Sequence, residues 1–177
     1  MSTIMRTWLA FAAIGAGIIH LALVISSPLP VALALLAVGA LETAWGALVL
    51  ARGRIARPRA VLFSALLPVL GWAILVTLST VFVRPDLASP LGFIPMGIAS
   101  VLDLAVALAL AIALRRGADP AAHGRELPAG RYLLGLLAGA LLVGTLTTPA
   151  LASTQAGQHA HHHGGPAFVL DDPHAGH

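Results

Sequence analysis

Three ionisable side chains stand inside long apolar segments of the chain: His20, Glu42 and Asp103. An ionisable group in the middle of a membrane-spanning helix costs roughly 2.5–3.5 kcal/mol, so such residues usually pair inside the protein or take part in function. Imidazole and carboxylate groups bind divalent transition metals. Met96 precedes Asp103 by two helical turns on the same face and offers a thioether. These four residues form the predicted intramembrane metal site.

Their depths in the membrane predict a stack of ligands. Glu42 and Asp103 each stand about eleven residues from the surface on the side of the C-terminal tail, which is roughly 16 Å and close to the midplane. His20 stands about six residues from that surface, roughly 9 Å deep. We therefore expect His20 and Met96 to form an upper ring above the two carboxyl groups, on a path that leads inward from the tail.

Structural interpretations of the same residues remain open. His20 and Glu42 are able to pair as a buried acid–imidazole contact, and a midplane acid is able to hydrogen-bond within the bundle. A proton-linked step, with Glu42 and Asp103 as carriers, is a further alternative. The sequence does not decide between metal handling, proton transfer and helix packing.

The C-terminal tail is rich in histidine, with six of the eight histidines in the last nineteen residues. Imidazole binds Cu(II), Ni(II) and Zn(II), and a glycine-rich chain lets several rings converge on one ion. Ala160 interrupts the histidine run and native-like sequence follows it, so an expression tag is a poor explanation. A solvated or pH-sensing tail is the alternative to metal binding. The predicted tail ligands are His159, His161, His162, His163, His174 and His177.

The composition indicates that lipid surrounds these residues. Of the 177 residues, 58% are hydrophobic and 10% are charged, whereas a soluble domain has about 25% charged residues. The apolar residues form five blocks of about twenty, the length that spans a hydrocarbon core. We predict an all-α integral membrane bundle over residues 1–152, followed by a flexible tail over residues 153–177. The five transmembrane helices are expected at about 7–26, 31–51, 60–83, 92–114 and 132–152.

The arginines predict how the chain is oriented. All ten basic residues are arginine, and nine of them fall on one side of the predicted membrane, with only Arg84 on the other. The positive-inside rule assigns the arginine-rich side to the cytoplasm. We therefore expect a multi-pass plasma-membrane protein with a cytoplasmic N-terminus and an extracytoplasmic tail.

Several classes of function are disfavoured. The chain has no cysteine, which excludes disulfides, thiolate metal sites and iron–sulfur clusters. It has no P-loop, no H-E-x-x-H and no supported pairing of a nucleophile with a base, so we do not expect an enzyme. Bis-histidine haem is disfavoured because only His20 lies within the membrane. No haem, flavin, nucleotide or nucleic acid is expected.

Small and aromatic residues predict how the helices pack. Gly135 and Gly139 form a G-x-x-x-G pattern, which lets two helices approach closely in lipid. The pattern supports a compact bundle without requiring a dimer. Trp8 and Tyr132 stand at the cytoplasmic ends of their predicted helices, where we expect them to anchor the chain at the interface.

Short motifs in the chain resemble a family of uncharacterised actinobacterial multi-pass membrane proteins. They are Gly17-Ile-Ile-His20, Gly39-Ala-Leu-Glu42-Thr-Ala-Trp45, and the segment that leads from Thr148 into the histidine run. The resemblance implies a small plasma-membrane protein with a histidine-rich external end. It implies no mechanism.

The predicted function is therefore binding or handling of a divalent transition metal (copper, zinc or nickel) by the tail and the intramembrane residues. The expected partners are the lipid bilayer, the metal ion and either another membrane protein or a second copy of the chain. A non-catalytic accessory or scaffold subunit of a membrane complex is the main alternative, in which the ionisable residues are packing contacts.

Overall fold

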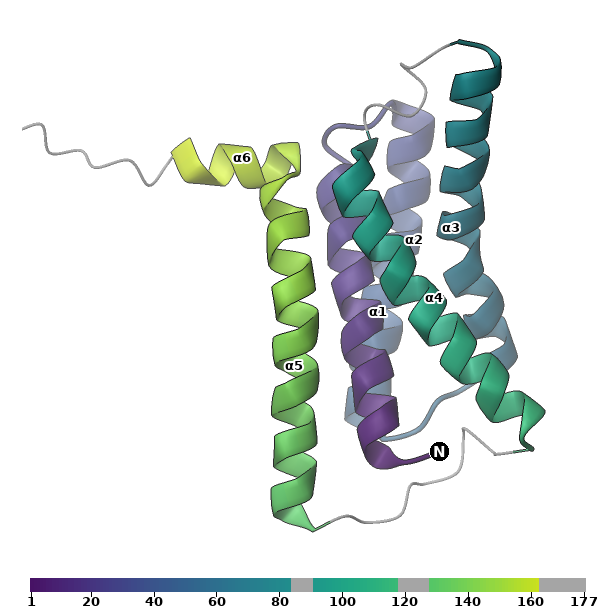
Figure 1. Ribbon diagram of the computed structural model, residues 1–177, viewed down its shortest axis with the longest axis vertical. Helices are drawn as coiled ribbons and strands as arrows, with labels where there is room; N and C mark the ends of the chain where they lie inside the picture. The colour runs from purple at the N-terminus through teal and green to yellow at the C-terminus, as the bar shows by residue number, and fades with distance from the viewer. Residues whose placement is uncertain (84–90, 118–127, 163–177) are drawn as a thin grey trace, which may run out of the picture.

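The computed structural model describes residues 1–83, 91–117 and 128–162, and side chains up to residue 158. These residues form helices and no strand, and five of the helices are long and apolar enough to cross a membrane. The predicted all-α membrane bundle is thereby confirmed (Figure 1). The helices are α1 (Thr3–Leu23), α2 (Leu29–Arg52), α3 (Pro58–Val81), α4 (Phe93–Arg115), α5 (Ala129–Ala152) and α6 (Gln155–His162).

The observed helix ends differ from the predicted ones by a few residues, most clearly in α1. This helix begins four residues earlier than expected because Ser2 caps it, accepting a hydrogen bond from the backbone N–H of Met5. It ends at Leu23 and not at residue 26. The hydroxyls of Ser26 and Ser27 both donate to the carbonyl oxygen of Leu23 and so satisfy the exposed end of the helix.

Helix α1 is the centre of the bundle. It contacts α2, α4 and α5, and it is the most buried of the five long helices. Helix α3 packs mainly on α4 and touches α2 only weakly, so it is almost entirely exposed on the outside of the bundle (Figure 1). The side chains of α1 therefore face three neighbouring helices, whereas a gap is left between α2 and α3.

Glycine contacts hold α1 and α2 together beside the predicted site. A Cβ atom at Gly17 would lie 2.7 Å from the carbonyl oxygen of Gly39, and a Cβ at Gly39 would lie 2.7 Å from that of Gly17. The two backbones therefore touch, as small residues allow in membrane helices. His20 follows Gly17, and Glu42 follows Gly39, by nearly one helical turn, so this contact sets the two side chains against each other.

We predict that Gly17→Leu destabilises the bundle by more than the roughly 1–3 kcal/mol typical of an overpacked core, because the obstructing neighbour is backbone and has no rotamer to change. The thermal midpoint of the protein in detergent measures the effect. Gly71→Leu in α3 is the matched control, since nothing lies within 4 Å of a Cβ at that position. Equal losses in the two variants would contradict the proposed backbone contact.

The predicted G-x-x-x-G pattern lies inside the bundle, between α5 and α1. A Cβ at Gly135 would meet Ile4, and one at Gly139 would lie 2.7 Å from Trp8. The indole N–H of Trp8 donates a 2.7 Å hydrogen bond to the carbonyl oxygen of Gly135. Trp8, expected to be an interfacial anchor, thus also joins two helices, and the pattern serves packing within one chain.

The start of the tail, which we expected to be flexible, forms a helix. Helix α6 follows a short turn and contacts both α5 and α1. Thr154 is buried, and its hydroxyl accepts a hydrogen bond from the backbone N–H of Gly157, which stabilises the first turn. The prediction of disorder for residues 163–177 lies outside the described residues.

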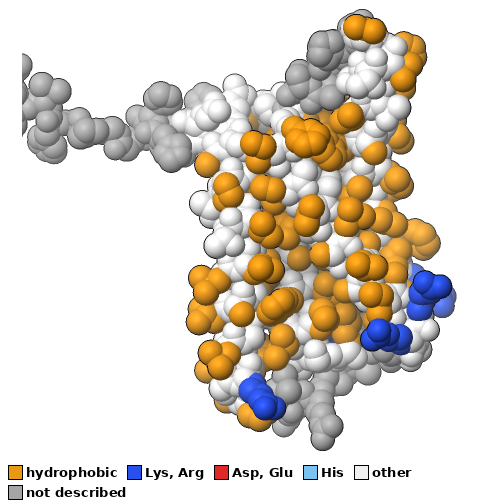
Figure 2. All heavy atoms as spheres, viewed as in Figure 1, with side chains coloured by type: hydrophobic (Ala, Val, Ile, Leu, Met, Phe, Trp, Pro, Cys, Tyr) orange, Lys and Arg blue, Asp and Glu red, His pale blue; other side chains and the backbone are white. Residues whose placement is uncertain are grey.

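The surface of the bundle matches a protein surrounded by lipid. Exposed leucine, isoleucine, valine and phenylalanine side chains cover the long helices, and arginines gather at the end that holds the N-terminus (Figure 2). We call this the arginine end, and the opposite end the α6 end. Arg84 and Arg125 lie outside the described residues. The assignment of the arginine end to the cytoplasm stays a prediction. The described arginines near the arginine end are Arg6, Arg52, Arg54, Arg57, Arg59, Arg115, Arg116 and Arg131.

Candidate metal centre in the bundle

Three helices bring His20, Glu42 and Asp103 together. One ligand atom from each side chain lies within 4.8 Å of the ligand atoms of the other two. The side chains come from α1, α2 and α4, and the residues are 0%, 9% and 1% exposed, respectively. The three ionisable residues predicted from the sequence thus form one buried cluster, which we call the His–Glu–Asp cluster.

An acid–imidazole contact lies within the cluster. His20 Nδ1 and Glu42 Oε2 are 2.8 Å apart. When Nδ1 carries the proton and donates it to the carboxylate, the lone pair of the ring lies on Nε2. A carboxylate in that position is an outer partner of a metal-binding histidine and lies on the opposite side of the ring from Nε2. An ion that is ligated by both His20 and Glu42 would instead lie between Nδ1 and Oε2.

Each member of the cluster has a buried polar atom without a hydrogen-bond partner among the described residues. These atoms are His20 Nε2, Glu42 Oε1 and Asp103 Oδ2. A buried polar atom left without a partner costs about 1–3 kcal/mol. One imidazole nitrogen and two carboxylate oxygens are donor atoms that divalent transition metals accept. The residues present therefore fit a divalent transition metal.

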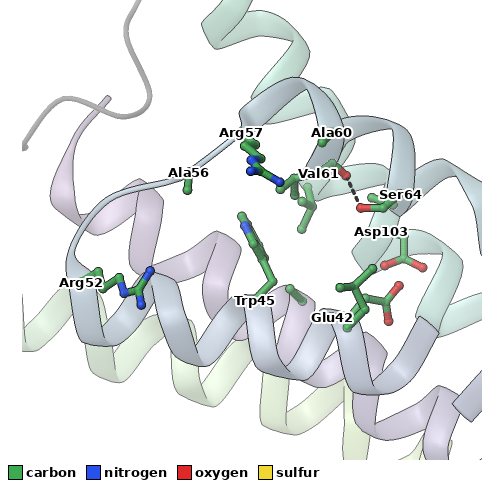
Figure 3. Close-up of a pocket in the computed structure, with 13 residues that line it drawn as sticks. Glu42, Trp45, Arg52, Ala56, Arg57, Ala60, Val61, Ser64 and Asp103 are labelled. Atoms are coloured by element: carbon green, nitrogen blue, oxygen red, sulfur yellow. Dashed lines mark hydrogen bonds between the residues drawn. The ribbon is translucent and has the colours of Figure 1, made fainter. Parts of the chain in front are cut away.

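A cavity of about 510 Å³ reaches the two carboxyl groups of the cluster. Small residues of α3 face α2 across it, which accounts for the space between these weakly packed helices. Trp45 lies along its wall, between the carboxyl groups of Glu42 and Asp103 and the side chains of Arg52 and Arg57 (Figure 3). The polar and aromatic residues that line it are Glu42, Trp45, Arg52, Arg57, Ser64 and Asp103.

The cavity approaches the cluster from the side opposite to the predicted one. Arg52 ends α2 and Arg57 precedes α3, so both mark the arginine end of the bundle. The sequence predicted an approach from the side of the tail, where α6 lies. Residue depth gives the distance of a group from each surface, but it does not say which side is closed by packing.

Met96 lies apart from the cavity that reaches the carboxyl groups. It is 2% exposed and lines an apolar hollow between α2, α3 and α4, together with Trp72 and Leu91. The predicted upper ring of His20 and Met96 therefore does not open into the cavity of the cluster. Burial in an apolar hollow favours a packing role for Met96.

The predicted tail ligands fall outside the described side chains. His159, His161 and His162 belong to α6 or its last turn, but their side chains lie outside the described ones. His163, His174 and His177 lie outside the described residues altogether. Their role as ligands stays a prediction.

The residues that line the cavity are hard to identify from the sequence. Trp45 stands three positions after Glu42 and so shares its helix face. Its indole N–H is buried without a partner among the described residues. Arg52 and Arg57 were noticed only as markers of orientation. An acid followed by an aromatic on one face of a membrane helix was the available signal.

Comparison of the chain with protein families, with curated proteins and with solved structures finds no match. The predicted family resemblance thus stays a prediction.

Proposed function

We propose that this chain is a small multi-pass membrane protein that binds a divalent transition metal ion (copper, zinc or nickel) at His20, Glu42 and Asp103. The observation that carries the proposal is that the three ionisable residues of the long apolar segments meet in one place. On membrane-insertion scales a residue such as Asp at the centre of a helix costs roughly 2.5–3.5 kcal/mol. Helix packing alone would need none of them.

The chemistry of the cluster supports the proposal. A divalent cation would offset the charge of two buried carboxylates, which are costly to hold side by side in a low-dielectric interior. The ion would contact one ligand atom of each side chain, and these atoms lie within 4.8 Å of one another. The ion would take the place of the proton between His20 Nδ1 and Glu42 Oε2, which are 2.8 Å apart, and this proton would be released on binding. Asp103 would supply the third ligand.

The histidine-rich tail supplies a second, separate metal-binding segment in this proposal. Helix α6 leaves the bundle at the end opposite to the arginines (Figure 1). Ions held by the tail and ions at the cluster would therefore occupy different places. Binding by the tail would be weaker, because ordering a flexible chain opposes it.

Calorimetric titration of the detergent-purified protein with Zn²⁺ tests the proposal. We expect the full chain to bind more than one ion, and a chain without residues 159–177 to keep one site of higher affinity. That truncation removes none of the three cluster residues. A truncated, folded protein that binds no Zn²⁺, Cu²⁺ or Ni²⁺ would overturn the proposal and favour a scaffold role.

A further inference from the structure

We propose that the cavity beside the cluster is an aqueous vestibule that connects the His–Glu–Asp cluster with the arginine end alone. Water would enter this cavity whether or not the cluster binds a metal ion. A metal ion would use the same route only if the function proposed above is correct.

The lining of the cavity favours water. A water molecule occupies about 30 Å³ in the liquid, and it remains in a protein cavity that offers several polar partners. The cavity, at about 510 Å³, has room for a hydrated ion. Carboxyl groups of Glu42 and Asp103 stand at its deep end, guanidinium groups of Arg52 and Arg57 at the other, and Ser64 lies between them. Polar groups thus stand at both ends of the cavity and at Ser64, and the other lining residues are alanine, leucine, valine and tryptophan.

The side chains on the other side of the cluster are apolar. One or two helical turns from the cluster toward the α6 end lie Leu23 of α1, Leu35 of α2 and Met96 of α4, which are 2%, 6% and 2% exposed. A hollow on that side, of about 360 Å³, is lined by apolar residues and proline. Apolar cavities stay dry. Among the described residues, polar lining therefore leads from the cluster toward the arginines and not toward α6.

The charges at the mouth have a consequence for ions. The exposed guanidinium groups of Arg52 and Arg57 disfavour a free cation near the mouth and attract anions. Salt screens such exposed charges over about 8 Å at physiological ionic strength. A cation therefore passes the mouth most readily at high ionic strength, and its rate of binding should rise with salt.

Single-cysteine labelling tests the vestibule, since the chain has no cysteine of its own. Ser64→Cys and Val61→Cys place a thiol in the cavity, and Ala34→Cys places one in the apolar hollow as the matched control. Arg54→Cys reports the arginine end and Ser27→Cys the α6 end. Each variant is treated, in sealed vesicles of both orientations, with a charged methanethiosulfonate reagent that does not cross membranes.

We expect the reagent to modify Ser64→Cys and Val61→Cys only in the vesicle orientation in which it also modifies the Arg54→Cys variant. We expect no modification of Ala34→Cys in either orientation. Two results would overturn the vestibule. One is protection of both cavity thiols in either orientation, which means that lipid or side chains fill the space. The other is modification in vesicles in which Ser27→Cys is the accessible reporter.

Repeating the labelling in the presence of Zn²⁺ distinguishes failure of the vestibule from failure of the proposed function. Bound Zn²⁺ is expected to slow the labelling of Val61→Cys, and the protection should vanish when Asp103→Asn is added. Labelling from the arginine end without zinc protection would leave the vestibule established and would count against metal binding at the cluster.

Discussion

Asp103→Asn is expected to weaken Zn²⁺ binding roughly a hundredfold or more in the chain shortened before residue 159, because altering even the outer partners of a metal ligand costs 10–100-fold. Asparagine keeps the size of aspartate but removes the negative charge. Asp103 is 1% exposed, so its carboxylate has few alternative partners. The hundredfold change corresponds to about 2.7 kcal/mol of binding free energy.

Ser100→Ala is the matched control for this prediction. Ser100 lies nearly one turn before Asp103 on α4, is buried, and has a hydroxyl oxygen without a partner among the described residues. Its removal changes the polarity of the same helix without touching the cluster, so affinity should stay at the unsubstituted value. Zn²⁺ affinity is measured by competition with a chelator. If Asp103→Asn and the unsubstituted chain bind Zn²⁺ equally well, Asp103 is not a ligand of the site.

The five membrane helices were predictable because their signal is local. Length and hydrophobicity within each block suffice to indicate a span, whatever the neighbouring helices are. Helix α6 was not predictable in this way. Its sequence is short and polar, and it depends on the Thr154 cap and on contacts with α1 and α5.

The members of the cluster were predictable from their cost in lipid, but their neighbours were not. The energetic argument identifies His20, Glu42 and Asp103 one residue at a time. Which helices adjoin depends on where backbones touch, and the pairing of Gly17 with Gly39 is a tertiary contact. A glycine in the sequence indicates a close approach without naming the partner helix.

The predicted path from the side of the tail depends on residue depth alone, whereas the described cavity reaches the cluster from the side of Arg52 and Arg57. Counting residues from the tail gives the depth of Glu42 and Asp103, yet access depends on packing. Ala60 and Ser64, four residues apart on α3, leave space against α2 at the arginine end. Bulkier apolar residues line the bundle toward α6. Such a difference arises only when the helices are assembled.

His20→Leu is expected to destabilise the protein by about 3–5 kcal/mol in the presence of a chelator, because it leaves Glu42 buried without its partner. Glu42 is 9% exposed, and its Oε2 contacts His20 at 2.8 Å. The double variant His20→Leu/Glu42→Leu removes both polar groups, and its stability should recover to that of the unsubstituted chain or exceed it. Unfolding in detergent, followed by circular dichroism, completes the double-mutant cycle.

The sign of the double variant's effect separates a functional pair from a packing contact. If the apolar double variant is at least as stable as the unsubstituted chain but binds no Zn²⁺, the chain retains the pair at no gain in stability, which a metal site explains and a scaffold does not. If the double variant is as unstable as the sum of the single variants, the two residues are not coupled and the observed contact contributes nothing. If it is folded but clearly less stable than the unsubstituted chain, the pair stabilises the bundle without an ion, and the scaffold role becomes the better explanation.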